Sequence, residues 1–173
     1  MSSVTIVIMG VSGSGKSTIL GLLEQQLGWP AAEGDEFHPA RNIEKMRAGH
    51  PLTDADRWPW LDSLATWIGD REMDRDNGLM TCSALKRSYR ERLSRHHPSV
   101  WYAQLTAPRE LIASRLRNRV HSYMPASLLE SQLQALEPLE PDEAGAQITV
   151  AAAPGKVVEE LLARLQSDRP GCL

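Results

Sequence analysis

Short apolar runs alternate along the chain with longer segments in which apolar residues recur every three or four positions. The short runs predict β-strands, and the longer periodic segments predict amphipathic helices. We expect five strands, at about 4–9, 31–33, 79–82, 100–105 and 147–151. We expect helices at about 16–27, 39–48, 54–68, 85–95, 107–119, 127–136 and 156–166. This regular alternation favours an α/β fold in which helices cover both faces of a five-stranded parallel sheet, giving three layers.

Two helix starts carry local signals. Thr53 is a suitable N-cap, because its hydroxyl can accept a backbone hydrogen bond and Asp56 adds negative charge to the first helical turn. We expect Thr106 to cap a later helix in the same way, with Pro108 in its first turn. These signals support the predicted order of elements.

The first apolar run leads directly into GVSGSGKST at residues 10–18, which matches the pattern G-x-x-x-x-G-K-[ST]. Glycines let successive backbone N–H groups turn inward around an anion, and the start of the next helix adds unpaired donors. Lys16 can reach the β- and γ-phosphates of a nucleotide, and the Ser17 hydroxyl can ligate Mg²⁺. A glycine turn that binds nothing is the alternative, but the flanking strand and helix favour a nucleotide-phosphate site. Its expected contacts are Gly10, Ser12, Gly13, Ser14, Gly15, Lys16, Ser17 and Thr18.

The bulk composition excludes several classes of protein. The 173 residues fit one domain, residues 1–173, and the net charge of −3 provides no basic field for nucleic acid. No apolar run approaches the roughly 18 residues of a membrane span, so we expect no membrane partner. Cys82 and Cys172 cannot form a disulfide framework, and we expect them to be reduced thiols of a cytoplasmic protein.

Two carboxylates follow the second predicted strand, at the edge where ligands bind in open α/β sheets. Asp35 can accept a hydrogen bond from a substrate hydroxyl and orient it towards the γ-phosphate. Glu33 can hold Mg²⁺ through water, since the third strand ends in Thr81 and Ser83 without a carboxylate. Ordinary turn chemistry is the alternative for both acids.

A set of cationic side chains accompanies this acid. Each is individually typical of a solvated surface charge, but together with Asp35 they suit a small substrate with a hydroxyl and an anionic group. The set is His38, Arg41, Lys45, Arg57, Lys86 and Arg87. We interpret the rest of the basic helix as a solvent-facing surface, including Arg90, Arg92, Arg95, His96 and His97.

Two further arginines precede a short predicted lid. Arg115 and Arg119 are four positions apart and therefore share a helix face. One arginine can stack on adenine while the other contacts phosphates. A surface ladder with Glu110 and Arg117 is the alternative.

Several motifs together resemble the gluconate kinases, or gluconokinases, within the branch of P-loop proteins that is similar to nucleoside monophosphate kinases. The matching stretches are GVSGSGKST (10–18), EGDEFHP (33–39), NIEKM (42–46), GHPLTDADRWPWL (49–61), CSALKRSYR (82–90), RLRNR (115–119), MPASLLESQLQALE (124–137) and PDE (141–143). The lid departs from the pattern, because it reads His-Ser-Tyr-Met-Pro at 121–125 where relatives often have Gly-His-Phe-Met-Pro.

The resemblance implies phosphorylation of D-gluconate at its 6-hydroxyl by ATP with Mg²⁺. It implies a substrate-binding insertion at about 36–70, a lid at about 119–127, and often a homodimer. Gluconate contacts would map onto Asp35, His38, Arg57, Lys86 and Arg87, and lid roles onto Arg115 and Arg119, with Lys16, Asp35 and Arg119 catalytic. The alternatives are a kinase of shikimate or a nucleoside monophosphate, a nucleotide-binding switch, and a catalytically weak member of the family.

Overall fold

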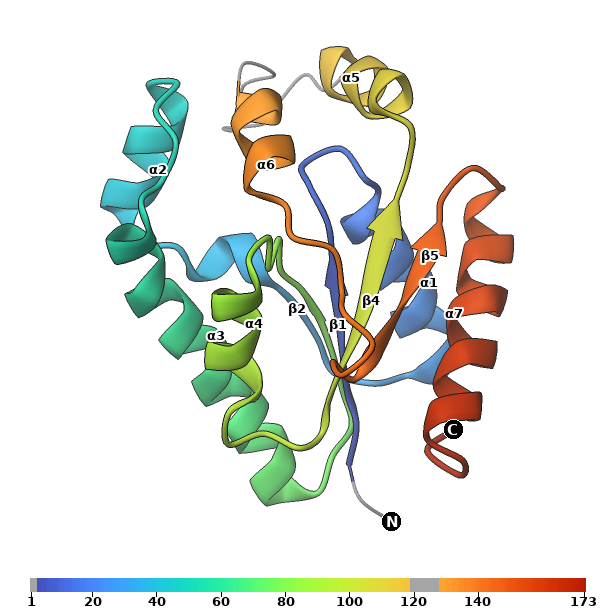
Figure 1. Cartoon of the computed structure of the whole chain (residues 1–173). Helices are drawn as coiled ribbons and strands as arrows, with labels where there is room; N and C mark the ends of the chain where they lie inside the picture. The colour runs from blue at the N-terminus through green and yellow to red at the C-terminus, as the bar shows by residue number, and fades with distance from the viewer. Residues whose placement is uncertain (1–2, 119–127) are drawn as a thin grey trace.

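A computed structural model describes residues 3–118 and 128–173 of the chain. Five parallel strands form one sheet in the order β2-β3-β1-β4-β5 (Figure 1). The strands are β1 (Thr5–Met9), β2 (Ala31–Glu33), β3 (Gly78–Thr81), β4 (Val100–Thr106) and β5 (Gly145–Thr149). The helices are α1 (Lys16–Leu27), the 3₁₀ helix η1 (Gly34–Phe37), α2 (Ala40–Arg47), α3 (Asp54–Asp74), α4 (Arg87–Ser94), α5 (Arg109–Arg117), α6 (Leu129–Ala135) and α7 (Pro154–Asp168).

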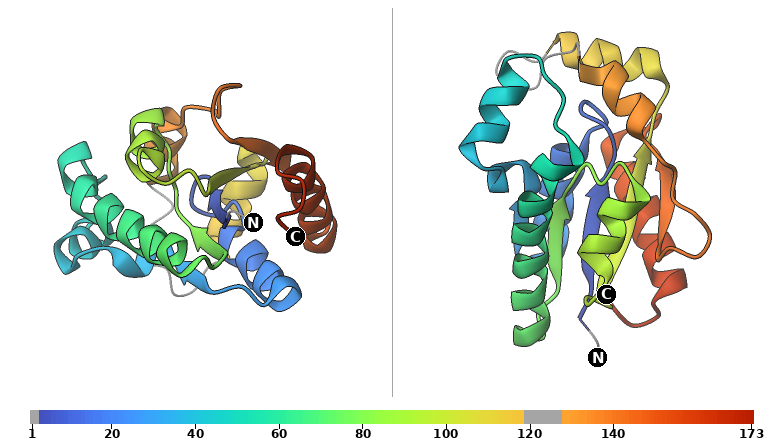
Figure 2. Two further views of the ribbon diagram at one scale, coloured as in Figure 1. Left: turned by 90° about the horizontal axis from the view of Figure 1, so that it is seen from below. Right: turned by 60° about the vertical axis from the view of Figure 1, so that its left-hand side comes forward.

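Alternate residues of the central strand supply the two faces of the sheet. Ile6 and Ile8 pack with α1 and α7 on one face, whereas Val7 and Met9 pack with α3 and α4 on the other. Figure 2 shows these two helix layers on opposite sides of the strands. All five β1 residues are buried, as expected for a central parallel strand covered on both faces. The three-layer α/β fold expected from the sequence is confirmed.

Several element boundaries differ from the expectation by two residues or more, including those of α3, α5 and β5. Helix α3 continues beyond residue 68 to Asp74, and the C-cap residue Arg75 adopts the left-handed conformation at φ 58°. Thr53 caps this helix as predicted, because its hydroxyl accepts from Asp56 N–H while the Asp56 carboxylate accepts from Thr53 N–H. The predicted capping role of Thr106 is wrong: this residue closes β4, and Pro108 precedes the first turn of α5.

The carboxyl ends of the parallel strands meet at the upper edge of the sheet in Figure 1. The loop after β1, helix η1 after β2 and the segment after β3 all begin there. Helices α5 and α6 also lie above this edge (Figure 1). The fold therefore gathers the sequence motifs at one end of the molecule. None of the described helices is long and apolar enough to cross a lipid bilayer.

Candidate active site

The loop between β1 and α1 is shaped by glycines in conformations that other residues rarely adopt. Gly10 has φ 144°, and a Cβ there would lie 2.9 Å from Ser14 Oγ and 3.0 Å from the Leu105 carbonyl oxygen. The Lys16 ammonium curls back over the loop, where Nζ donates to the carbonyl oxygens of Gly10 and Val11 at 3.0 Å each. A positive charge therefore lies against the glycine-rich loop, as a phosphate site requires.

One hollow lies on the α1 and α7 side of this loop. Arg115 of α5 reaches it and donates from Nη1 to the Ser14 carbonyl oxygen at 3.3 Å. The opposite wall comes from the segment after β5 and is mostly apolar, which suits the flat face of a nucleotide base. The described lining of this first hollow is Gly13, Ser14, Gly15, Thr18, Ile19, Arg115, Val150, Ala152, Pro154 and Val157.

The sequence interpretation missed the apolar wall of the first hollow. Val150 and Pro154 carry no recognisable motif, because apolar residues before a helix start are common. The available signal was positional: the segment follows the carboxyl end of the fifth strand, at the same edge as the phosphate loop.

A second hollow lies on the other side of the loop and is mainly polar. It collects side chains from β2, η1, α2, α3, β3 and α6, and it shares Gly13 with the first hollow. Its described lining is Ser12, Gly13, Lys16, Ser17, Glu33, Asp35, His38, Met46, Leu52, Arg57, Trp60, Thr81, Ser83, Leu85 and Gln132. The two hollows therefore meet at the phosphate loop, with Lys16 and Ser17 on the side of the second.

Glu33 is held at this junction by the neighbouring strand. Thr81 Oγ1 donates to Glu33 Oε2 at 2.6 Å and accepts from the Gly34 N–H at 3.0 Å. A Cβ at residue 34 would lie 2.0 Å from the Thr81 carbonyl oxygen, so only glycine permits this close approach of η1 to β3. Glu33 and Ser17 line the same hollow, and their carboxylate and hydroxyl oxygens are the hard ligands that Mg²⁺ prefers.

Asp35 and His38 form the polar floor of the second hollow. His38 Nε2 lies 4.0 Å from Asp35 Oδ1, and the His38 side chain is only 4% exposed. Burial lowers the pKa of His38 to about 4, with the Arg57 charge adding to this effect against the opposing pull of Asp35. The ring is therefore neutral at neutral pH. Asp35 is more than half exposed and faces a ligand entering the hollow.

Arg57 is the cation that α3 brings to the second hollow. Its Nη1 donates to the Leu52 carbonyl oxygen and, at 3.3 Å, to the Tyr89 hydroxyl. Tyr89 in turn donates to Asp54, which pairs with Lys86 Nζ at 3.0 Å. Lys86 is thus linked to the hollow through two intermediate side chains and is absent from its described lining.

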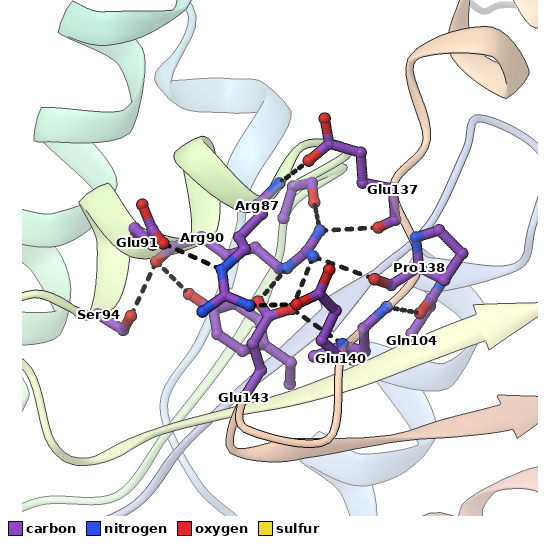
Figure 3. Close-up of polar contacts among 12 residues, drawn as sticks. Arg87, Arg90, Glu91, Ser94, Gln104, Glu137, Pro138, Glu140 and Glu143 are labelled. Carbon is purple, nitrogen blue, oxygen red and sulfur yellow. Dashed lines mark hydrogen bonds and ion pairs between the residues drawn. The ribbon is translucent and has the colours of Figure 1, made fainter.

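Arg87 is absent from the described lining of the second hollow and pairs with acidic side chains instead (Figure 3). Its guanidinium pairs with Asp142 at 2.6 Å, with Glu91 at 3.0 Å and with Glu140. The structure therefore does not bring Arg87 to the predicted substrate position, because acidic residues more than 50 positions later in the chain bind it instead.

Arg90 is a buried structural residue, so its interpretation as part of a solvent-facing surface is wrong. Its side chain is 1% exposed, and its Nη2 donates to Glu143 Oε2 at 2.8 Å. Nη1 donates to the carbonyl oxygens of Ala84 and Glu137, both at 3.0 Å (Figure 3). Burial opposes ionisation of Glu143, but its hydrogen bonds outweigh burial and lower the pKa of the carboxyl. Arg90 thereby joins the segment after β3 to the segment before β5.

Gln132 of α6 is a pocket residue that the sequence interpretation did not single out. Its Oε1 accepts from the Ser12 N–H at 2.7 Å, which connects α6 to the phosphate loop. The sequence signal that could have identified Gln132 was its position within the stretch at 124–137 that resembles the gluconate kinases. The predicted lid at 119–127, including Arg119 and its expected catalytic and nucleotide-binding roles, lies outside the described residues.

Comparisons with known proteins agree on one group of enzymes. No family model matches the chain. A gluconokinase from Gluconobacter oxydans is 42% identical over 163 residues, an alignment covering 94% of this chain and 92% of that protein. A solved sugar kinase from Janibacter superposes with a TM-score of 0.91 at 45% identity, covering 98% of both chains. A solved gluconokinase from Sinorhizobium meliloti superposes with a TM-score of 0.83 at 40% identity, covering 96% of this chain and 93% of that one.

Proposed function

The chain belongs to the gluconokinase family, and we propose that it transfers the γ-phosphoryl group of ATP to the 6-hydroxyl of D-gluconate. The observation that carries this proposal is the junction of two unlike hollows at one phosphate loop. The first has an apolar wall beside Arg115, which suits adenine and its phosphates. The second combines carboxylate, imidazole and guanidinium groups, which suit a polyhydroxy acid.

Asp35 is the group we assign to the attacking alcohol. A carboxylate there accepts the hydrogen bond of the substrate hydroxyl and turns its oxygen towards the phosphate loop. Phosphoryl transfer depends mainly on positioning and on stabilising negative charge, so a weak base suffices. We assign the charge stabilisation to Lys16, whose ammonium lies against the phosphate loop and lines the second hollow.

The metal site is assigned to Ser17 and Glu33. They line the same hollow, and Thr81 fixes the carboxylate of Glu33 beside the phosphate loop. Mg²⁺ bound with ATP would neutralise phosphate charge during transfer. Among the described residues no cluster of three histidine, cysteine or acidic side chains could hold a metal alone, so these two residues would share it with phosphate and water.

The gluconate carboxylate needs a cation, and we assign it to Arg57, which lines the second hollow together with Lys16 of the phosphate loop. His38 adds a neutral hydrogen-bonding group beside it. We assign Lys86 an indirect role, because Asp54 and Tyr89 separate it from Arg57. Arg115 is assigned to the nucleotide, and Arg119 keeps its proposed lid role from the family motif RLRNR.

The wider proposals rest on the family resemblance. Residues 36–70 would serve as the substrate-binding insertion, since they supply His38, Met46, Leu52, Arg57 and Trp60 to the second hollow. We propose a homodimer acting on a small molecule in the cytoplasm, where the free thiols of Cys82 and Cys172 would remain reduced. Sedimentation of the purified chain tests the dimer.

A coupled ADP-release assay tests the function. The enzyme is given ATP and Mg²⁺ with D-gluconate, related sugar acids, shikimate or AMP in separate reactions. We expect turnover with gluconate and none with shikimate or AMP. Turnover with shikimate or AMP but not with gluconate would overturn the proposed substrate, although the assignment of the phosphate site would still stand. ADP release without any acceptor would indicate a nucleotide hydrolase instead.

A further inference from the structure

Asn42 is fully buried between the imidazole of His38 and the start of α3. Its Nδ2 lies 3.3 Å from His38 Nδ1 and donates to the Asp56 carbonyl oxygen at 2.9 Å. No donor among the described residues reaches its Oδ1. A buried amide oxygen without a protein donor costs free energy of folding. We therefore expect the Asn42 side chain to have a role that offsets this cost.

The Asp56 carbonyl oxygen determines which way the Asn42 amide points. A backbone carbonyl can only accept, so the amide atom facing it must be the NH₂ group. The reversed amide would place two oxygens face to face and lose this bond. One N–H of Nδ2 is thus committed to Asp56, and the other points to His38 Nδ1.

An N–H that points at His38 Nδ1 requires a lone pair on that nitrogen. The ring is neutral, as its burial dictates, and its single proton must then be on Nε2. The ring plane is fixed as well, because it stacks on Trp60 with centroids 4.1 Å apart. Nε2 is the nitrogen that faces Asp35 Oδ1 at 4.0 Å.

We propose that Asn42 is a positioning residue that holds His38 as the Nε2–H tautomer, so that the ring presents a hydrogen-bond donor beside the Asp35 carboxylate. A donor and an acceptor side by side match an alcohol group, whose oxygen accepts from His38 while its hydrogen is donated to Asp35. The opposite tautomer would present a lone pair next to a carboxylate, and no neutral hydroxyl satisfies two acceptors at once. The role in binding sugar-acid hydroxyls rests on the proposed function; the tautomer itself does not.

Nitrogen-15 NMR of the histidine side chains tests the proposal in the complete wild-type protein at neutral pH without substrate. A protonated and an unprotonated ring nitrogen differ strongly in chemical shift, and their couplings to the ring protons tell Nδ1 from Nε2. The signals of His38 are those that disappear in His38→Gln. We expect an unprotonated Nδ1 and a protonated Nε2. A protonated Nδ1, in a neutral or a charged ring, would overturn the proposal whether or not the protein phosphorylates gluconate.

Asn42→Asp then tests the cause. A carboxylate can only accept, so His38 Nδ1 should become protonated, and the KM for gluconate should rise about 10-fold with little change in the KM for ATP. Asn77→Asp is the matched control: Asn77 binds the Val4 N–H through Oδ1, at the opposite end of the sheet, and a carboxylate oxygen can replace it. An unprotonated His38 Nδ1 in Asn42→Asp would refute the role of Asn42. If that variant does not fold, the wild-type spectrum still decides the tautomer.

Discussion

The imidazole of His38 stacks on the indole of Trp60, with ring centroids 4.1 Å apart and planes inclined by 16°. Trp60 is itself anchored, because its Nε1 donates to the Gly34 carbonyl oxygen at 2.8 Å. Helix α3 therefore supplies a rigid surface on which the segment after β2 places its functional groups. Trp60 belongs to the hydrophobic core and also forms part of the wall of the second hollow.

Burial of His38 makes stability depend on pH in a defined window. Its pKa falls from 6.5 in the unfolded chain to about 4 in the folded protein, so the unfolded state binds an extra proton between these values. The free energy of unfolding should therefore decrease as the pH drops through this window, by up to about 1.4 kcal/mol per pH unit. The charged groups facing the ring are Asp35 and Arg57.

Urea unfolding at several pH values measures this effect. His38→Gln should reduce the slope of stability against pH, whereas His50→Gln, at an exposed histidine of the same segment, should leave it unchanged. Equal slopes in the wild type and His38→Gln would contradict a buried neutral ring.

Thr81→Val tests the support of the metal site. Loss of the hydroxyl releases Glu33 and leaves the buried Gly34 N–H without its acceptor, which should cost about 1–3 kcal/mol of stability. Initial rates against free Mg²⁺ should show a higher concentration for half-maximal activity. Thr81→Ser retains the hydroxyl and should stay near wild type. The same Mg²⁺ requirement in both variants would argue against a role of Glu33 at the metal.

Arg57 and Arg87 make a paired test of substrate contact. Arg57 lines the second hollow, whereas Arg87 is bound by Glu140 and Asp142. Arg57→Gln should raise the KM for gluconate about 10-fold or more, because a charge-assisted hydrogen bond to the carboxylate is lost. Arg87→Gln should change that KM little. Steady-state kinetics at saturating ATP measures the KM for gluconate of both variants. A larger increase in Arg87→Gln than in Arg57→Gln would indicate that Arg87 binds the substrate carboxylate.

Arg90 and Arg92 differ in burial although both pair with an acid. The Arg90 pair with Glu143 is buried, whereas the Arg92 pair with Asp62 is about half exposed. Arg90→Met should lower the free energy of unfolding by about 3–5 kcal/mol, because Glu143 is left charged and unpaired. Arg92→Met should lower it by less than about 1 kcal/mol. Denaturant unfolding of the two variants measures both, and equal losses would contradict the contrast in burial.

Local patterns were sufficient for the fold and the phosphate loop. The alternation of strands and helices follows from hydrophobic periodicity, and the glycine loop follows from local backbone conformation. Both features are therefore determined by residues close together in the sequence. Asp35 and Arg57 were also predicted to act together, and they line one hollow. Their catalytic and binding roles stay proposals.

The remaining site residues depend on contacts between distant segments. Arg90 looks solvent-facing in its own helix, and only Glu143, 53 positions later, explains its burial. Arg87 was assigned to the substrate because its own segment does not reveal Glu140 and Asp142, two acids that follow α6 and bind its guanidinium. The role of Asn42 depends on the Asp56 carbonyl oxygen, a backbone atom whose direction no sequence motif records.

The position of phosphate on the product tests the central claim most directly. After reaction of the enzyme with ATP, Mg²⁺ and D-gluconate, correlation of phosphorus with proton signals identifies the esterified carbon. Only C6 of gluconate bears two protons, so the account predicts a phosphorus nucleus coupled to a methylene pair. Coupling to a single proton would place the phosphate on a secondary hydroxyl, and absence of any phosphorylated gluconate would contradict the account.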